Sequence, residues 1–248
     1  MVVTVAFMIT LRRGQQVMLM HKCYYAATAL LLLWLLVIFA MSFIPPDMME
    51  ILQILDATTT MCGAFIPAFI LLFSISYIRE YNDTLPKWSW CIFIIPVVST
   101  IMVFTNPLHH FYYRKFALEN SAVEFGPYFY IHSFYTYACV TASLLLIVRY
   151  AIKSKSRLHV WQAVLFVAGS LCPLLVNLLV TFHILDASIV LTPVSFAFTL
   201  AFHGIVIYRL HFFDIRPVAM QQLLNWIRDC YLVTGKDGRV VNYNLPFL

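Results

Sequence analysis

Six long apolar stretches decide what this chain can fold into. Each is close to the ~20 residues with which an α-helix crosses ~30 Å of hydrocarbon. They are Tyr24–Ile44, Ile51–Ile78, Trp88–Phe104, Tyr128–Val148, Val160–Phe182 and Ile189–Tyr208. Only 11% of the residues are charged, whereas a soluble domain carries about 25%. The sequence therefore predicts an all-α fold, a polytopic membrane helix bundle.

A shorter apolar stretch, Met1–Leu11, precedes these six. As a helix it would rise only about 16 Å, so it cannot cross a bilayer alone. It does not resemble a signal peptide, because Arg12 and Arg13 follow the apolar run and no small-residue cleavage site comes after it. We expect a short or truncated first helix and six full spans, seven helices in all.

The basic residues predict the orientation of the bundle. With these spans, Arg114 and Lys115 fall on one side and the other 14 of the 16 Lys and Arg residues fall on the opposite side. Because cytoplasmic loops carry an excess of Lys and Arg, the second side is predicted to be cytoplasmic. The N-terminus is then outside and the C-terminus inside. The net charge of +5 thus reports topology in a membrane and indicates no nucleic-acid partner.

The spans exclude several membrane functions. Proton pumps and ion-coupled transporters need charges at mid-membrane, but no Asp, Glu, Lys or Arg lies at the centre of a span, and Asp56 is only two turns from an end. The last span has no lysine for a retinal Schiff base, and its His203 fits a hydrogen-bonded core residue better than a haem ligand. The six cysteines lack metal or disulfide spacing. We expect no cofactor and no metal.

Polar and aromatic residues gather in the long loop between Thr105 and Pro127. Asn106-Pro107 should end the helix before the loop and Gly126-Pro127 should start the next one. Between them, Phe111–Leu118 and Val123–Phe125 flank a turn and predict a small outer hairpin.

This loop and the neighbouring helix ends form the predicted ligand site. One interpretation is a pocket roofed by the hairpin; the other is that each histidine only pins the hairpin by bonding a loop carbonyl. Two adjacent histidines without a spaced third ligand are a weak metal signal. The candidate binding residues are Asn106, His109, His110, His132, Asp56, Asn177 and Asp186.

Six motifs in register resemble the N-terminal seven-helix membrane region of bacterial sensor histidine kinases, a region that also precedes diguanylate cyclases. The motifs are LFSISYIREYN, TNPLHHFYY, GPYFYIH, LCPLLVNLL, LDASIVLTPV and FFDIRPVAMQQLL. The family pattern is matched by Asn106 to His110, by Gly126, Pro127 and His132, by Pro173 and Asn177, by Thr192 and Pro193, and by Asp214 and Pro217 to Ala219. The resemblance covers nearly the whole chain.

The resemblance implies three parts: a membrane sensor over 1–210, a cytoplasmic linker helix over 211–229, and the start of a PAS domain over 230–248. In the linker, helical spacing favours a homodimer through one apolar face. The signalling residues assigned to it are Asp214, Pro217, Val218, Leu224 and Ile227. The last part contains two short β-prone runs around Lys236-Asp237-Gly238, which predict a hairpin.

The function predicted from the sequence is that of a sensor module in a two-component-type signalling protein. It would bind an extracellular or membrane-borne small ligand at its outer face and signal to a kinase or cyclase domain. The sequence contains neither a phosphoacceptor hairpin nor a glycine-rich phosphate loop, so we expect no kinase activity of this polypeptide itself. The alternative is a small permease, for which an internal repeat and paired broken helices would be expected.

Overall fold

The computed structural model describes residues 19–79, 86–117, 122–154, 157–181, 184, 191–210, 232–234 and 240–243. Backbone contacts divide the chain into two units, Met1–Leu210 and His211–Leu248. Met1–Leu11, Asp186 and the linker residues Asp214, Pro217, Val218, Leu224 and Ile227 lie outside the described residues.

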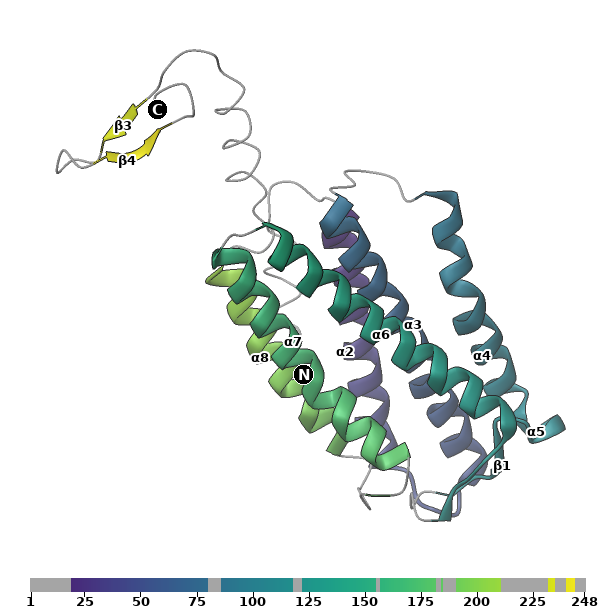
Figure 1. Ribbon diagram of the computed structural model, residues 1–248. Coiled ribbons are helices and arrows are strands. Elements are labelled where there is room, and N and C mark those ends of the chain that lie inside the picture. The colour runs from purple at the N-terminus through teal and green to yellow at the C-terminus, as the bar shows by residue number, and fades with distance from the viewer. Residues whose placement is uncertain are drawn as a thin grey trace. The chain divides into compact units, whose positions relative to one another are not determined.

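The first unit is a bundle of long helices (Figure 1). Helix α3 (Met49–Arg79) packs against α2 (Leu19–Met41), α4 (Ile94–Phe104) and α6 (Pro127–Ser154), and α7 (Arg157–Thr181) packs against α6 and α8 (Leu191–Tyr208). Five of the described helical segments are long and apolar enough to cross a membrane, and α8 contains a shorter apolar segment, Ser195–Ile207. The predicted multi-pass, all-α membrane bundle is therefore confirmed. Its elements are α2 (Leu19–Met41), α3 (Met49–Arg79), the 3₁₀ helix η1 (Lys87–Phe93), α4 (Ile94–Phe104), α5 (Asn106–His109), α6 (Pro127–Ser154), α7 (Arg157–Thr181) and α8 (Leu191–Tyr208).

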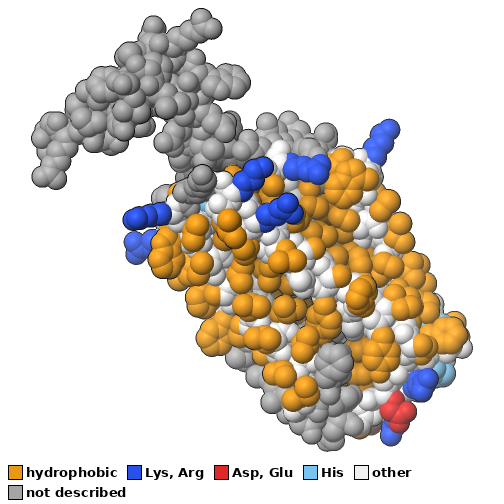
Figure 2. Space-filling model, in the orientation of Figure 1, with side chains coloured by type: hydrophobic (Ala, Val, Ile, Leu, Met, Phe, Trp, Pro, Cys, Tyr) orange, Lys and Arg blue, Asp and Glu red, His pale blue; other side chains and the backbone are white. Residues whose placement is uncertain are grey.

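Apolar side chains cover the wall of the bundle, and polar side chains lie inside it. Phe134 and Ile152 on α6 are 77% and 70% exposed, and Figure 2 shows hydrophobic side chains over most of the wall. Inside, the hydroxyls of Ser74 on α3 and Ser143 on α6 form a buried hydrogen bond. This arrangement suits a protein whose surroundings are lipid, because hydrogen bonds between helices then join groups that lipid cannot satisfy.

Charged residues separate to the two ends of the bundle. Figure 2 shows Lys and Arg side chains gathered at one end, with acidic and basic side chains together at the other. We call the first the basic end; it carries Lys22, Arg79, Lys87, Arg149, Lys153, Arg157 and Arg209. We call the second the hairpin end; it carries Asp47, Glu50, Asp56, Arg114, Lys115 and Glu124. The assignment of the basic end to the cytoplasm stays a prediction.

Proline shapes the start of the third described span. The sequence predicts one apolar helix over Trp88–Phe104, but the structure begins it with 3₁₀ turns, Lys87–Phe93, before α4. Pro96 has no N–H to donate to the carbonyl of Ile92, four residues earlier. The hydroxyl of Tyr135 on α6 donates to that carbonyl instead, at 2.5 Å. A neighbouring helix thus supplies the missing donor.

The predicted outer hairpin is present. Strand β1 (Tyr113–Lys115) pairs antiparallel with β2 (Glu124–Phe125). Its base is joined to the start of α6, because the N–H of Gly126 donates to the carbonyl of Tyr112 at 2.8 Å. A Cβ at Gly126 would lie 2.1 Å from the carbonyl oxygen of Phe111, so only glycine fits. Helix α6 then begins at Pro127, as predicted.

The second unit contains one described pair of strands. Strand β3 (Leu232–Thr234) pairs antiparallel with β4 (Val240–Tyr243). The hairpin predicted from the two β-prone runs near the C-terminus is therefore confirmed. The PAS interpretation of this hairpin stays a prediction.

Candidate ligand cavity

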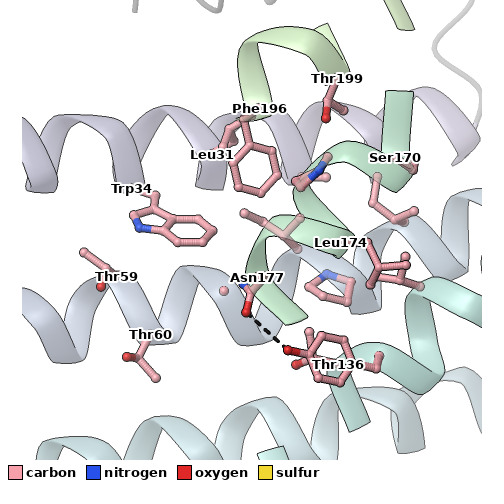
Figure 3. A pocket seen from close by; sticks show the side chains of 18 of the residues that line it. Leu31, Trp34, Thr59, Thr60, Thr136, Ser170, Leu174, Asn177, Phe196 and Thr199 are labelled. Atoms are coloured by element: carbon pink, nitrogen blue, oxygen red, sulfur yellow. Dashed lines mark hydrogen bonds between the residues drawn. The ribbon is translucent and has the colours of Figure 1, made fainter. Parts of the chain in front are cut away.

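A cavity of ≈ 260 Å³ lies inside the bundle. Residues from α2, α3, α6, α7 and α8 line it, together with Tyr112 and Tyr113 from the base of the hairpin. Figure 3 shows how side chains from these helices converge on it. Because five helices meet here, a molecule in the cavity would touch most of the bundle at once.

The cavity wall has an aromatic part and a polar part. Trp34 on α2 and Phe196 on α8 meet edge to face, with ring centroids 5.3 Å apart. Across the cavity in Figure 3 lie Thr136 and Asn177, and Asn177 Oδ1 accepts a hydrogen bond from the hydroxyl of Tyr137 at 3.3 Å. No Asp, Glu, Lys or Arg is among the described residues that line the cavity. The wall therefore suits an uncharged molecule with both apolar and hydrogen-bonding parts.

His203 joins three helices at the cavity wall. It is 2% exposed. Its Nδ1 lies 2.7 Å from the hydroxyl of Tyr24 on α2, and its Nε2 lies 3.2 Å from the carbonyl of Phe166 and from the hydroxyl of Ser170, both on α7. The imidazole also stacks on the ring of Phe166, with centroids 4.3 Å apart. The interpretation of His203 as a hydrogen-bonded core residue is confirmed.

Two polar atoms on α6 are enclosed without a hydrogen-bond partner among the described residues. They are Nδ1 of His132 and Oγ1 of Thr136, and both residues line the cavity. The ring of His132 meets that of Tyr112 edge to face at 5.6 Å. Buried polar atoms are normally paired by protein, water or ligand. Unpaired polar groups at a cavity wall are therefore available to form hydrogen bonds with a bound molecule.

The hairpin closes the cavity with two tyrosines. Tyr112 is 1% exposed. Burial and then the nearby Asp56 carboxylate raise the pKa of both Tyr112 and Tyr113 well above 10, so both phenols stay protonated donors. Asp56 lies beside Tyr113, and its Oδ2 is enclosed with no partner in the described part of the chain. Asp56 therefore lies behind Tyr113, which lines the cavity, but Asp56 itself is not a lining residue.

Asn106 holds the hairpin in place. Its Oδ1 accepts from the backbone N–H groups of Tyr112 and Tyr113, both at 2.9 Å, and its Nδ2 donates to the carbonyl of Tyr113 at 3.1 Å. Three hydrogen bonds thus fix the segment that carries the two closing tyrosines.

The two adjacent histidines belong to the turn before the hairpin. His109 Nδ1 accepts from the N–H of Phe111 at 3.0 Å, and its Nε2 lies 3.0 Å from the hydroxyl of Thr105. His110 is exposed and ends α5 in the left-handed conformation, with φ of 55°. His109 therefore pins the turn through an N–H and a hydroxyl, where a loop carbonyl was the expected partner.

The candidate residues therefore fall into two groups. His132 and Asn177 line the cavity, whereas Asn106, His109, His110 and Asp56 are not among its lining residues. The binding roles predicted for both groups stay predictions. Seven further lining residues were not predicted from the sequence: Trp34, Thr59, Thr60, Thr136, Ser170, Phe196 and Thr199. For the four threonines and Ser170, the only signal in the sequence is that hydroxyl-bearing residues recur within otherwise apolar spans, and Trp34 and Phe196 carry no such signal.

The fold and the cavity define a multi-pass membrane helix bundle with an internal, uncharged cavity. Residues 1–217 match the family described as the N-terminal 7TM region of histidine kinase. The chain belongs to this family, which places it as the membrane sensor region of a histidine kinase. This membership favours the sensor over the alternative of a permease. No curated protein and no solved structure matches the chain.

Proposed function

We propose that this region detects a small molecule that binds in the internal cavity. The observation that carries the proposal is the convergence of five helices and the hairpin base on one uncharged space. An occupant that fits one arrangement of these helices better than another shifts the bundle toward it, which is all that a receptor requires. The ligand is extracellular or membrane-borne.

We also propose how the signal leaves the bundle. Helix α8 contributes Phe196 and His203 to the cavity wall and ends at Tyr208. A displacement of α8 would pass to the segment 211–229, the proposed linker helix, whose apolar face would pair with a second copy. The basic end is the proposed cytoplasmic side, where a kinase domain would receive the signal.

The test partly fills the cavity with a larger side chain at Gly63, where the structure has room for one. A Cβ at Gly63 meets nothing within 4 Å, and Gly63 lines the cavity. In the histidine kinase that carries this region, reconstituted in lipid nanodiscs, Gly63→Leu should change the autophosphorylation rate by about fivefold or more, the usual scale of coupling between sites. The sign of the change tells whether the filled state is the active one.

The matched control is Phe134→Leu on the lipid-facing wall, where the side chain is 77% exposed. It should leave autophosphorylation within about a factor of two, as expected of a surface substitution. Equal rates for wild type and Gly63→Leu would show that the cavity does not control the output. That result would remove the proposal.

A further inference from the structure

Prolines within these helices free backbone carbonyls. Each proline lacks the N–H that would bond the carbonyl four residues earlier. Pro96 frees the carbonyl of Ile92, which accepts from the hydroxyl of Tyr135 on a neighbouring helix. Pro173 frees that of Gly169, which accepts from Thr199 Oγ1 of α8 at 2.7 Å. In a membrane such groups need replacement donors, and here the bundle provides them.

Pro67 differs from Pro96 and Pro173 in the surroundings of the carbonyl that it frees. Pro67 lies inside α3 and frees the carbonyl of Gly63. In the described part of the chain no side chain donates to this carbonyl, and both Gly63 and Pro67 line the cavity. The absence of a Cβ and the open space beside Gly63 leave the backbone uncovered there. The cavity wall therefore presents a backbone acceptor that α3 cannot supply with its regular donor.

Size and charge restrict what could use this acceptor. A cavity of 150 Å³ takes benzene, so the ≈ 260 Å³ found here suits a molecule of about ten non-hydrogen atoms. The uncharged lining disfavours an ion, since a buried charge needs a partner. The aromatic pair of Trp34 and Phe196 offers a wall for a flat ring, and Trp34 lies on α2, which packs directly on α3.

We propose that the ligand is a neutral, ring-bearing molecule of about this size whose hydroxyl or N–H donates to the carbonyl of Gly63, while its ring lies against Trp34 and Phe196. This inference rests on the proposed function, since it names the ligand class of the same cavity. A donor-bearing ligand replaces the N–H that Pro67 lacks. A ligand without a donor leaves the carbonyl unpaired and binds less well.

Three bicyclic probes separate the requirements: 2-naphthol carries a donor, naphthalene has none, and 2-naphthoate is an anion. Binding to the full 248-residue chain in lipid nanodiscs is measured by equilibrium dialysis. The same nanodiscs carrying Gly63→Leu give the background from partition into lipid. We expect 2-naphthol to bind about two- to tenfold more tightly than naphthalene, the scale of one net hydrogen bond, and 2-naphthoate to bind more weakly than 2-naphthol by about tenfold or more.

The decisive variant is Pro67→Ala, which restores an N–H for the Gly63 carbonyl within α3. It should bring the preference for 2-naphthol over naphthalene close to one, while naphthalene binding persists. The control is Pro96→Ala, which lies outside the cavity lining and whose freed carbonyl already has a donor; it should keep the wild-type preference.

The two possible negative results lead to different conclusions. If Pro67→Ala keeps the wild-type preference, the Gly63 carbonyl is not the acceptor and this inference falls, although the cavity can still be the sensor site. If no probe binds above the Gly63→Leu background, the ligand class is wrong. The autophosphorylation test of Gly63→Leu then decides separately whether the cavity controls the kinase.

Discussion

The hydrogen bond between Tyr24 and His203 offers a sharp test of how the cavity wall is held together. Nε2 of His203 faces the carbonyl of Phe166, which can only accept, so in a neutral imidazole Nε2 carries the proton. Nδ1 is then a bare acceptor, and the hydroxyl of Tyr24 donates to it at 2.7 Å. Tyr24→Phe removes this donor and leaves the buried Nδ1 unpaired.

The expected cost follows from these contacts. Hydrogen bonds between membrane helices contribute about 0.6 kcal/mol on average and up to about 1.7 kcal/mol, whereas a buried acceptor left unpaired costs about 1–3 kcal/mol. His203 is 2% exposed, so water is not readily available to it. We expect Tyr24→Phe to lower the free energy of unfolding by about 1–2 kcal/mol, which lowers Tm by about 2–8 °C for a chain of this size.

Thermal unfolding of the purified chain in nanodiscs measures this change. Tyr25→Phe is the matched control, because the described structure shows no hydrogen bond of the Tyr25 hydroxyl; it should change stability by less than about 0.5 kcal/mol. In a His203→Leu background, where no side-chain acceptor remains, Tyr24→Phe should cost almost nothing. An equal cost of Tyr24→Phe in both backgrounds would refute the hydrogen bond as the cause.

Two further predictions follow from backbone contacts and from charge. Gly126→Ala places a Cβ 2.1 Å from the carbonyl oxygen of Phe111 and should destabilise the hairpin by more than about 2 kcal/mol. Amide exchange in β1 and β2 should become faster. The control, Gly63→Ala, should not destabilise the bundle. A phosphatase that is active only outside the cytoplasm, fused after Leu248, should be inactive; an active fusion would reverse the proposed orientation.

The nature of the spans could be predicted from the sequence because twenty apolar residues have few alternatives in a bilayer. The helix ends were less predictable. Hydropathy indicates a start at Tyr24, whereas α2 begins at Leu19 and includes His21 and Lys22. A helix continues past the hydrocarbon for as long as its backbone bonds hold, so hydropathy marks the lipid boundary and not the helix end.

The cavity could not be predicted in the same way. In a membrane both the lipid-facing and the inward-facing sides of a helix are apolar, so the pattern shows little contrast between them. Leu31 and Leu33 are the same residue two positions apart, yet Leu31 is 6% exposed and lines the cavity while Leu33 is 38% exposed. Of the histidines and acids that the sequence offers as binding residues, only His132 therefore lines the cavity in the described part of the chain.

The freed carbonyl of Gly63 illustrates what only the packing can show. The sequence contains Pro67, Pro96 and Pro173 alike, and only the register between helices determines which freed carbonyl meets a hydroxyl. A bare carbonyl would be costly in a dry core, but a cavity of ≈ 260 Å³ has room for water that can bond it when no ligand is present. A ligand that carries a donor displaces this water and replaces its hydrogen bond, whereas a purely apolar ligand displaces the water and leaves the carbonyl bare. In both cases the Gly63 carbonyl needs a hydrogen-bond donor: water supplies it when no ligand is bound, and a ligand that displaces the water must supply it instead.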